Sequence, residues 1–546
     1  MKDLIFKMKG KILLVMISLL SVVALSGCFE RQATITIDPT KTQLYVGVYD
    51  GDLGTQWIFE EVAAKYVELN PDIQIIPIKE KDLYGDTFLL ENMKSENTDI
   101  YLLNGNTYSN YIARGLISDI TTEVTTPLDE YENTGKSIED KMSTALQKHY
   151  EVDGKYYAVP FFDSVFGTVY DADLFENEGF YFNTDGDLLC DSSNSTLSAG
   201  PNGVTGDYDD GLPATYSEWK ELVDTIYDTG YTPYIWTGQY YLYRQRFITS
   251  VWADYEGKTN FDLNMSLNGS YTFAGESTPT QITVENGYLL KEKGQKGQEY
   301  ALQMAEYIIR KGYYTSDSFD SYNTHTLAQE TFLYSTRKKP IAMIFEGGWW
   351  ENGARGVFET MVEDFGQEYA YGTRNFGFMP APKADDGSSD PGTTLISSTG
   401  NSFICINKNS DVLEIAKDFL RFLHTDESLR TFTRVTGAVR PYDYELTKED
   451  RAAMTNFGRT MFDIYHDPNT QISYTNLYED EVFLKEPDFF SYANWSWGAT
   501  LDGIPTTDPM YEFTQSKTLT VQQYLAGMKE RYSKSAWDKQ LKNKYY

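Results

Sequence analysis

Cysteine, histidine and positive charge are scarce in this chain of 546 residues. It has three Cys and four His residues, and 47 Lys and Arg residues stand against 80 Asp and Glu residues, for a formal net charge of −33. Three cysteines without a C-x-x-C pair provide no disulfide framework and no zinc signature. The negative charge argues against a nucleic-acid partner, because that affinity depends on Lys and Arg neutralising phosphates.

Enzyme signatures are also missing. The chain has no G-x-S-x-G and no G-x-x-x-x-G-K-[ST] sequence, which argues against serine hydrolases and P-loop proteins. The four histidines are isolated, so no metalloenzyme pattern is present. A glycosidase would need a pair of carboxylates, and no spacing identifies one. We therefore expect no enzymatic activity and no cofactor, with a surface glycosidase as a distant alternative.

Apolar and aromatic residues are plentiful. Hydrophobic residues make up 41% of the chain and aromatic residues 15%, including 43 Tyr. A chain of this length corresponds to two to four domains at ~100 to 200 residues each. Most of the rings are expected in cores, and a minority of the tyrosines would suit flat, hydrogen-bonding ligand surfaces.

The N-terminal segment has the pattern of a signal peptide. Four lysines precede an apolar run, Ile12 to Leu25, that is too short to span a bilayer as a mature helix. The run ends in Leu25-Ser26-Gly27-Cys28, which resembles the lipobox of bacterial lipoproteins. We expect residues 1–27 to be removed, Cys28 to be lipidated and residues 28–41 to tether the protein to the outer face of the cell membrane. The alternative is an ordinary cleavage site beside an incidental cysteine.

The mature sequence begins with strands that alternate with a helix. Residues 44–48, 73–78 and 99–103 have strand patterns, and a helical pattern over 57–69 ends at Asn70-Pro71. This order predicts a parallel sheet with crossover helices. Ligands bind such sheets at the loops that follow the strands, which makes Asp50, Asp52 and Asn106 candidate ligand residues.

Residues 181–213 interrupt this pattern. The stretch is dense in Gly, Asp, Asn and Ser and has little periodicity, so we expect an inserted loop region. A helix should begin just after it, because Thr215 and Glu218 have the spacing of a capping box.

Several motifs, in order over nearly the whole mature chain, resemble one protein family. They are GKYYAVP at 154–160 with YDADLF at 170–175, PATYSEW at 213–219, KPIAM at 339–343 with Gly347-Gly348-Trp349, FMPAPK at 378–383, and IAKDFLRFL at 415–423 with Thr436-Gly437. They are similar to the family 1 extracellular solute-binding proteins of bacterial ABC importers, the group that includes the maltose-binding protein.

This resemblance implies an α/β, two-lobe periplasmic-binding-protein-like fold of type II, with hinges and a ligand cleft between the lobes. Lobe 1 would comprise residues 42–162 and 398–440, and lobe 2 residues 163–397 and 441–546, with crossings near Phe162, Ser397 and Val439. The implied function is capture of a sugar or oligosaccharide and delivery to the permease subunits of an ABC transporter, by a monomer. A non-sugar solute such as a peptide, polyol or chelate is the alternative.

A pyranose needs flat aromatic faces and polar groups that hydrogen-bond in pairs. Trp349 and Trp350 follow the strand-like run 341–345, and the preceding glycines would let the turn bring an indole into the cleft. The resemblance places Trp236, Gln239 and Tyr240 at the cleft, with Trp495 or Trp497. Asp163 and Ser164 lie at the first expected lobe crossing, and Glu346, Asn401 and Arg440 are further polar candidates.

A calcium loop is a separate prediction. Residues 200–211, GPNGVTGDYDDG, resemble the calcium loop of type II secretion pseudopilins, with Asn202, Asp209 and Asp210 as candidate ligands. Hard cations prefer such clustered oxygen donors. The alternative is a solvated acidic turn.

Overall fold

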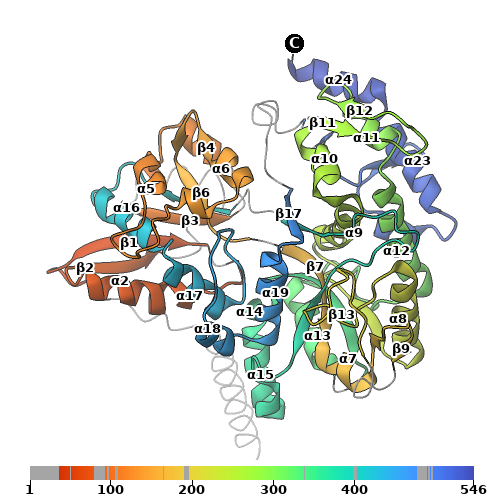
Figure 1. Cartoon of the computed structure of the whole chain (residues 1–546), viewed down its shortest axis with the longest axis horizontal. Helices are drawn as coiled ribbons and strands as arrows, with labels where there is room; N and C mark the ends of the chain where they lie inside the picture. Colours follow the sequence, from red (N-terminus) through yellow and green to blue (C-terminus); the bar gives the residue numbers. More distant parts are fainter. Residues whose placement is uncertain are drawn as a thin grey trace, which may run out of the picture.

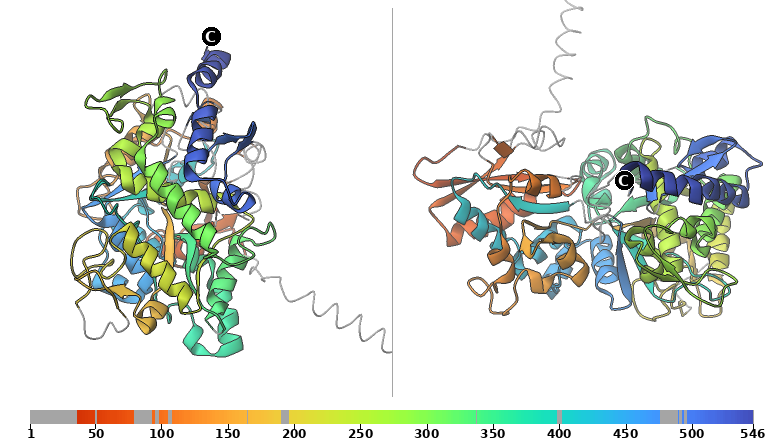
Figure 2. Two further views of the ribbon diagram at one scale, coloured as in Figure 1. Left: turned by 90° about the vertical axis from the view of Figure 1, so that its right-hand side faces the viewer. Right: turned by 90° about the horizontal axis from the view of Figure 1, so that it is seen from above.

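A computed structural model of the chain describes residues 36–49, 51–78, 93–94, 98–104, 108–163, 165–189, 196–336, 338–397, 402–475, 489, 492–493 and 496–545. These residues form two lobes that lie side by side, each built around its own sheet (Figures 1 and 2). No helix within them is both long and apolar enough to cross a membrane.

The first lobe contains a five-stranded sheet in the order β2-β1-β3-β16-β6. The strands are β1 (Thr42–Val48), β2 (Ile73–Ile78), β3 (Ile100–Asn104), β6 (Ala158–Pro160) and β16 (Ser402–Ile406). β1 is parallel to β2 and β3, whereas β16 runs antiparallel to β3 and β6. The expected parallel pairing of the first three strands is therefore confirmed.

Helices flank this sheet on both faces (Figure 1). The predicted helix over 57–69 is present as a π-helical segment, Trp57–Val62, that continues into α2 (Ala63–Leu69). The other helices of this lobe are α4 (Tyr108–Ala113), α5 (Thr121–Thr125), α6 (Thr144–Tyr150), α16 (Leu413–Phe422), α17 (Asp426–Thr436) and α18 (Lys448–Ala453). The rings of Trp57 and Phe432 meet edge to face at 4.9 Å, which joins the π-helical segment to α17.

The second lobe contains a six-stranded sheet. Its strands follow the order β10 (Thr232–Ile235), β13 (Ile341–Gly347), β7 (Val165–Asp171), β15 (Thr393–Ser397) and β17 (Thr470–Tyr474), and β14 (Phe376–Met379) also pairs with β7. β7 is antiparallel to its neighbours, while β10 and β13, and β15 and β17, pair in parallel.

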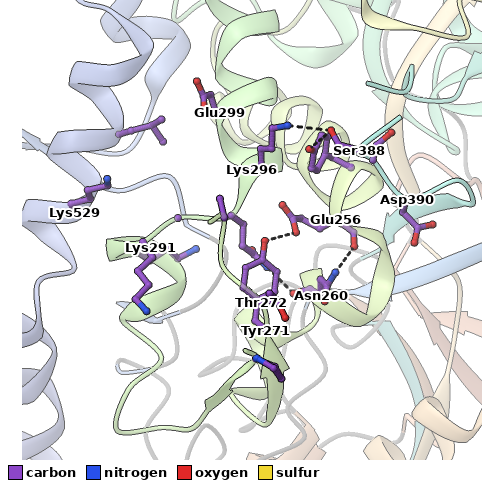
Figure 3. A pocket seen from close by; sticks show the side chains of 18 of the residues that line it. Glu256, Asn260, Tyr271, Thr272, Lys291, Lys296, Glu299, Ser388, Asp390 and Lys529 are labelled. Carbon is purple, nitrogen blue, oxygen red and sulfur yellow. Dashed lines mark hydrogen bonds between the residues drawn. The ribbon is translucent and has the colours of Figure 1, made fainter. Parts of the chain in front are cut away.

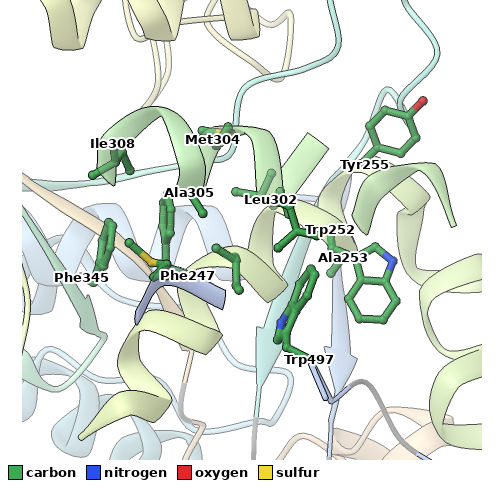
Figure 4. Packing of buried hydrophobic residues seen from close by; sticks show 14 of the residues in the cluster. Phe247, Trp252, Ala253, Tyr255, Leu302, Met304, Ala305, Ile308, Phe345 and Trp497 are labelled. Carbon is green, nitrogen blue, oxygen red and sulfur yellow. The ribbon is translucent and has the colours of Figure 1, made fainter. Parts of the chain in front are cut away.

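Two long helices carry the core of the second lobe. α9 (Tyr241–Phe261) packs against α12 (Lys296–Lys311) and against the sheet (Figure 4). Phe247 of α9 stacks on Phe345 of β13 at 3.9 Å, and Trp252 meets Trp497 at 5.3 Å. This aromatic core accounts for much of the high ring content of the sequence.

Shorter elements complete the second lobe: α7 (Ala172–Glu178), α8 (Tyr216–Asp228), α10 (Leu263–Ser266), α11 (Leu289–Glu292), α13 (His325–Ser335), α14 (Trp350–Gly353), α15 (Arg355–Phe365), α19 (Asn456–His466), α22 (Pro509–Gln515), α23 (Val521–Arg531) and α24 (Lys534–Tyr545). Two-stranded pieces are β4 (Glu151–Val152) with β5 (Lys155–Tyr156) in the first lobe, and β8 (Tyr181–Phe182) with β9 (Leu188–Leu189), β11 (Gly269–Tyr271) with β12 (Thr280–Ile282), and β18 (Ala499–Leu501) with β19 (Ile504–Thr506) in the second. α8 begins at the predicted capping box of Thr215 and Glu218.

The chain passes between the lobes three times. The passages run from β6 to β7, from β15 to β16, and from α18 to α19 (Figure 1). Tyr442 and Tyr444 follow the third expected crossing at Val439, yet both pack in the core of the first lobe.

Candidate ligand-binding site between the lobes

A loop of the first lobe touches two helices of the second. Asp52, in the loop after β1, lies with Oδ2 3.3 Å from Nε2 of His325, the first residue of α13. Asn352 of α14 donates from Nδ2 to the backbone oxygen of Asp52 at 2.8 Å. Asp52 has a φ of 65°, a left-handed conformation that short polar residues tolerate and that projects the turn toward the other lobe. The facing surfaces of the two lobes therefore meet at Asp52.

Two tyrosine rings lie beside His325. Tyr243 lies nearly parallel to His325 with ring centroids 6.5 Å apart, and Tyr240 lies 5.7 Å from the same ring. Tyr240, Tyr241 and Leu242 are each more than two fifths exposed, which is unusual for three consecutive large residues. This group places flat, accessible rings beside a carboxylate and an imidazole.

Trp349 extends the aromatic group at the end of β13. Its indole meets Phe166 edge to face at 4.7 Å, keeps 8% of its surface exposed and packs with the core of the first lobe. A Cβ at Gly347 would collide with this indole, so a glycine is required for the turn to fold back. Of the two adjacent tryptophans, Trp349 is the one at the lobe interface.

Glu346 lies behind these rings with 1% of its surface exposed. Gln329 donates to its Oε1 at 3.0 Å and the Gly347 amide to its Oε2 at 3.1 Å. Burial raises the pKa of Glu346 to about 8, against the effect of these two donors and of nearby His325. At neutral pH the group therefore holds a proton and is a neutral hydrogen-bonding partner.

The same environment acts on its neighbours. The hydrogen bond to Asp52 raises the pKa of His325, which favours its charged form at the interface. Burial raises the pKa of Tyr243 well above its ordinary value; the negative charges of Glu346, once it ionises at high pH, and of Asp52 add to this, and a hydrogen bond to Trp349 opposes it. Asp52 of the first lobe and His325, Glu346 and Tyr243 of the second therefore influence one another's ionisation.

Four predicted ligand residues are instead fully buried. Trp350 packs against Phe376, and Trp236 stacks on Phe345 at 5.0 Å, each within its own core. The Trp497 indole donates to Thr249 at 2.8 Å, and the Arg440 guanidinium donates to backbone oxygens of the first lobe, including that of Leu423 at 2.7 Å. Because these four side chains have no exposed surface, the structure corrects the prediction that they contact a ligand.

Asp163 lies in the first passage between the lobes, against the start of the second. Its amide donates to the backbone oxygen of Val439, which follows α17 of the first lobe, at 2.9 Å. Its carboxylate accepts hydrogen bonds from Ser397, at the second passage, and from Tyr465 of α19. Asp163 is 3% exposed, so its position suits a hinge tie rather than the ligand contact that was expected.

Two of the other predicted residues are exposed, and six lie outside the described part of the chain. Gln239 and Tyr240 are exposed at the start of α9, as a ligand surface requires. The remaining predicted residues lie outside the described part of the chain: Cys28, Asp50, Asn106, Ser164, Asn401 and Trp495.

Sequence reasoning missed His325, Tyr243 and Asn352. His325 was one of four isolated histidines, and its partner Asp52 is far away in the sequence, so no local pattern joins them. The run of three tyrosines within residues 240–243 was the one available signal, since it continued the aromatic segment already singled out.

A separate cavity of about 700 Å³ lies within the second lobe. It is lined from α9 by Tyr255 and Glu256, from β11 by Tyr271, and from the start of α12 by Lys296 (Figure 3). Tyr271 donates to Glu256 at 2.9 Å, so two of its polar groups are already paired. None of the predicted ligand residues lines this cavity, and the cluster around Asp52 and His325 remains the candidate site.

The comparisons with known proteins agree with the fold. Residues 61–450, more than half of the chain, match the family described as bacterial extracellular solute-binding protein. A search of curated proteins finds no match.

Solved structures with the same fold cover most of the chain. RafE in complex with raffinose has a TM-score of 0.53 at 13% identity, over 90% of this chain and 100% of that one. The apo form of RafE from Streptococcus pneumoniae has a TM-score of 0.53 at 13% identity, over 92% and 100%. A chitin oligosaccharide binding protein has a TM-score of 0.52 at 13% identity, over 91% and 100%. The fold is thus the two-lobe, type II periplasmic-binding-protein-like fold that the sequence predicted, and the chain belongs to the bacterial extracellular solute-binding protein family.

Proposed function

We propose that this protein captures a sugar or oligosaccharide between its lobes and delivers it to the permease of an ABC importer. The observation that carries the proposal is the group of exposed tyrosines beside Asp52 and His325 at the lobe interface. Flat rings suit the apolar face of a pyranose, and the polar side chains suit its hydroxyls. The structural relatives with raffinose and with chitin oligosaccharides in their names support this class of ligand.

The proposed mechanism is capture without chemistry. A ligand that contacts both lobes only when they close has a higher affinity for the closed form and shifts the population toward it. The closed form would then dock on the permease. We also propose that Cys28 carries the lipid anchor, which would raise the concentration of the protein beside its permease.

For the lobes we propose the division expected from the sequence, with one change. Lobe 1 comprises residues 42–162 and begins again at 398, and lobe 2 contains residues 163–397 and the C-terminal part. We place the last crossing between α18 and α19 instead of at Val439, because Tyr442 and Tyr444 pack in the first core.

The test is thermal unfolding of the fragment 29–546 with a panel of mono- and oligosaccharides, peptides and polyols. A ligand of the native state raises the melting temperature by mass action. We expect one saccharide class to do so. Tyr240→Ala should weaken its binding by about ten-fold or more, as for a ring at the centre of a contact surface.

Tyr227→Ala is the matched control, because Tyr227 is 45% exposed against 43% for Tyr240 and lies on α8, away from the Asp52 cluster. The control should bind the sugar like the native protein. Stabilisation by a peptide or polyol and by no saccharide would reject a sugar ligand, and equal losses in both variants would reject the site.

A further inference from the structure

The loop of residues 198–211 in the second lobe turns back on itself, and its backbone amides donate hydrogen bonds to the carboxylates of Asp209 and Asp210. Gly200, Gly203, Gly206 and Gly211 have φ values between 59° and 90°, a conformation that favours glycine. The Gly211 amide donates to the backbone oxygen of Ser198 at 2.8 Å, which closes the loop at its base. The segment is thus an ordered loop.

Asp209 lies at the centre of this loop and is fully buried. Its Oδ2 accepts a hydrogen bond from the Asn202 amide at 3.1 Å. A Cβ at Gly200 would collide with Asp209, so the carboxylate lies directly against the start of the loop. Its Oδ1 is buried and has no hydrogen-bond partner among the described residues.

Asp210 repeats this arrangement. Its Oδ2 accepts from the Gly206 amide at 2.7 Å, and its Oδ1 is buried without a partner in the described part of the chain. The hydroxyl oxygen of Ser198, at the base of the loop, is a third such atom. Three buried side-chain oxygens of one loop are therefore without a hydrogen bond in the described part of the chain, whereas buried polar atoms are normally satisfied.

No basic side chain supplies that partner. Asp207, Asp209 and Asp210 lie within four residues of the sequence, and no described Lys or Arg forms an ion pair with any of them. The hydrogen bonds of Asp207 are already made, to the Asn202 side chain at 2.8 Å and the Asp209 amide at 3.3 Å.

We propose that this loop binds a calcium ion through Oδ1 of Asp209 and Asp210, with neutral oxygens of the loop completing the shell. No three His, Cys, Asp or Glu side chains in the described ranges are grouped to hold a metal by themselves, so hydroxyl and backbone oxygens must contribute most ligands. Ca²⁺ accepts such mixed oxygen shells with flexible geometry, whereas Mg²⁺ demands a near-ideal octahedron.

The position of the loop indicates what the ion would do. Gly211 accepts at its backbone oxygen from the Phe182 amide, 2.8 Å away, and the loop leads directly into the capping box of α8. A cation here would neutralise the buried charge and fix the inserted segment on the second lobe. This inference does not depend on the proposed ligand between the lobes.

The first experiment uses Tb³⁺ as a luminescent substitute for Ca²⁺ on the fragment 29–546. Tyr208, next to Asp209 in the sequence, provides a sensitising ring. We expect saturable Tb³⁺ luminescence, and we expect Ca²⁺ to displace the bound Tb³⁺ more effectively than Mg²⁺ does. Asp209→Asn and Asp210→Asn should each lower the Tb³⁺ affinity by at least ten-fold. Asp187→Asn is the matched control, because Asp187 is an exposed carboxylate of the same insertion.

The second measurement is the melting temperature in EDTA and in millimolar Ca²⁺. Ca²⁺ should raise it in the native protein and in Asp187→Asn, and leave it unchanged in Asp209→Asn. In EDTA the Asp209→Asn variant should melt no lower than the native protein, since it removes an uncompensated buried charge. Absence of a Ca²⁺ effect on the native protein, stronger displacement by Mg²⁺, or an equal loss in Asp187→Asn would each overturn the proposal.

Discussion

The raised pKa of the buried carboxyl of Glu346 makes the stability of the protein depend on pH. Burial raises its pKa to about 8, so the folded protein keeps a proton that the unfolded chain releases near the ordinary carboxyl pKa. Between these two pH values the folded state binds more protons, and stability falls as the pH rises. Above the folded pKa both states are ionised and the effect levels off.

We therefore expect Glu346→Gln to gain stability over the native protein as the pH rises. The difference in free energy of unfolding should grow by up to about 1.4 kcal/mol per pH unit until about pH 8 and then stay constant. Denaturant unfolding of both proteins from pH 5 to pH 9 measures it. A difference that does not change with pH would show that Glu346 is ionised throughout.

At the residue scale, the sequence predicted Asp52, Tyr240, Glu346 and Trp349 of this cluster but not His325, Tyr243 or Asn352. Trp349 and Trp350 are equivalent in the sequence, and only packing separates them: a turn at Gly347 brings Trp349 to the interface and leaves Trp350 in the core. His325 was missed because its partner belongs to the other lobe. Whether a side chain faces a ligand or a core depends on contacts between distant segments, which no local pattern encodes.

At the element scale, the sequence was more informative. The strands at 73–78 and 100–104 and the start of α8 agree with prediction because alternation and capping are local properties. The Glu218 side chain returns to the Thr215 amide while the Thr215 hydroxyl accepts from the Glu218 amide, so the box is complete. The antiparallel strand β16 was not predicted, since it reaches its partners β3 and β6 from a distant part of the chain.

The capping box makes a prediction for α8. Thr215→Ala should destabilise the first turn of the helix by about 1 kcal/mol, because the Glu218 amide loses its acceptor. Hydrogen exchange of the amides at the start of α8 measures this as roughly five-fold faster exchange. Thr215→Ser keeps the hydroxyl and should exchange like the native protein. Equal exchange in the Ala and Ser variants would contradict the role of the cap.

At the scale of the whole molecule, two lobes are joined by three chain passages and by contacts between their facing surfaces. Each lobe has its own sheet, and Asp163 in the first passage bonds to Val439 of the first lobe, to Ser397 at the second passage and to Tyr465 of α19. Away from that point, Asp52 and His325 join the lobes by a contact of 3.3 Å. Such a layout suits hinge motion, in which a few residues absorb the change and the lobes stay intact.

The most direct test of the central claim is small-angle X-ray scattering of fragment 29–546 during titration with the saccharide that stabilises it. Because the ligand would contact both lobes, we predict that the radius of gyration decreases in parallel with saturation. Tyr240→Ala should require a higher sugar concentration for the same decrease. Full saturation with an unchanged radius of gyration would contradict capture between the lobes.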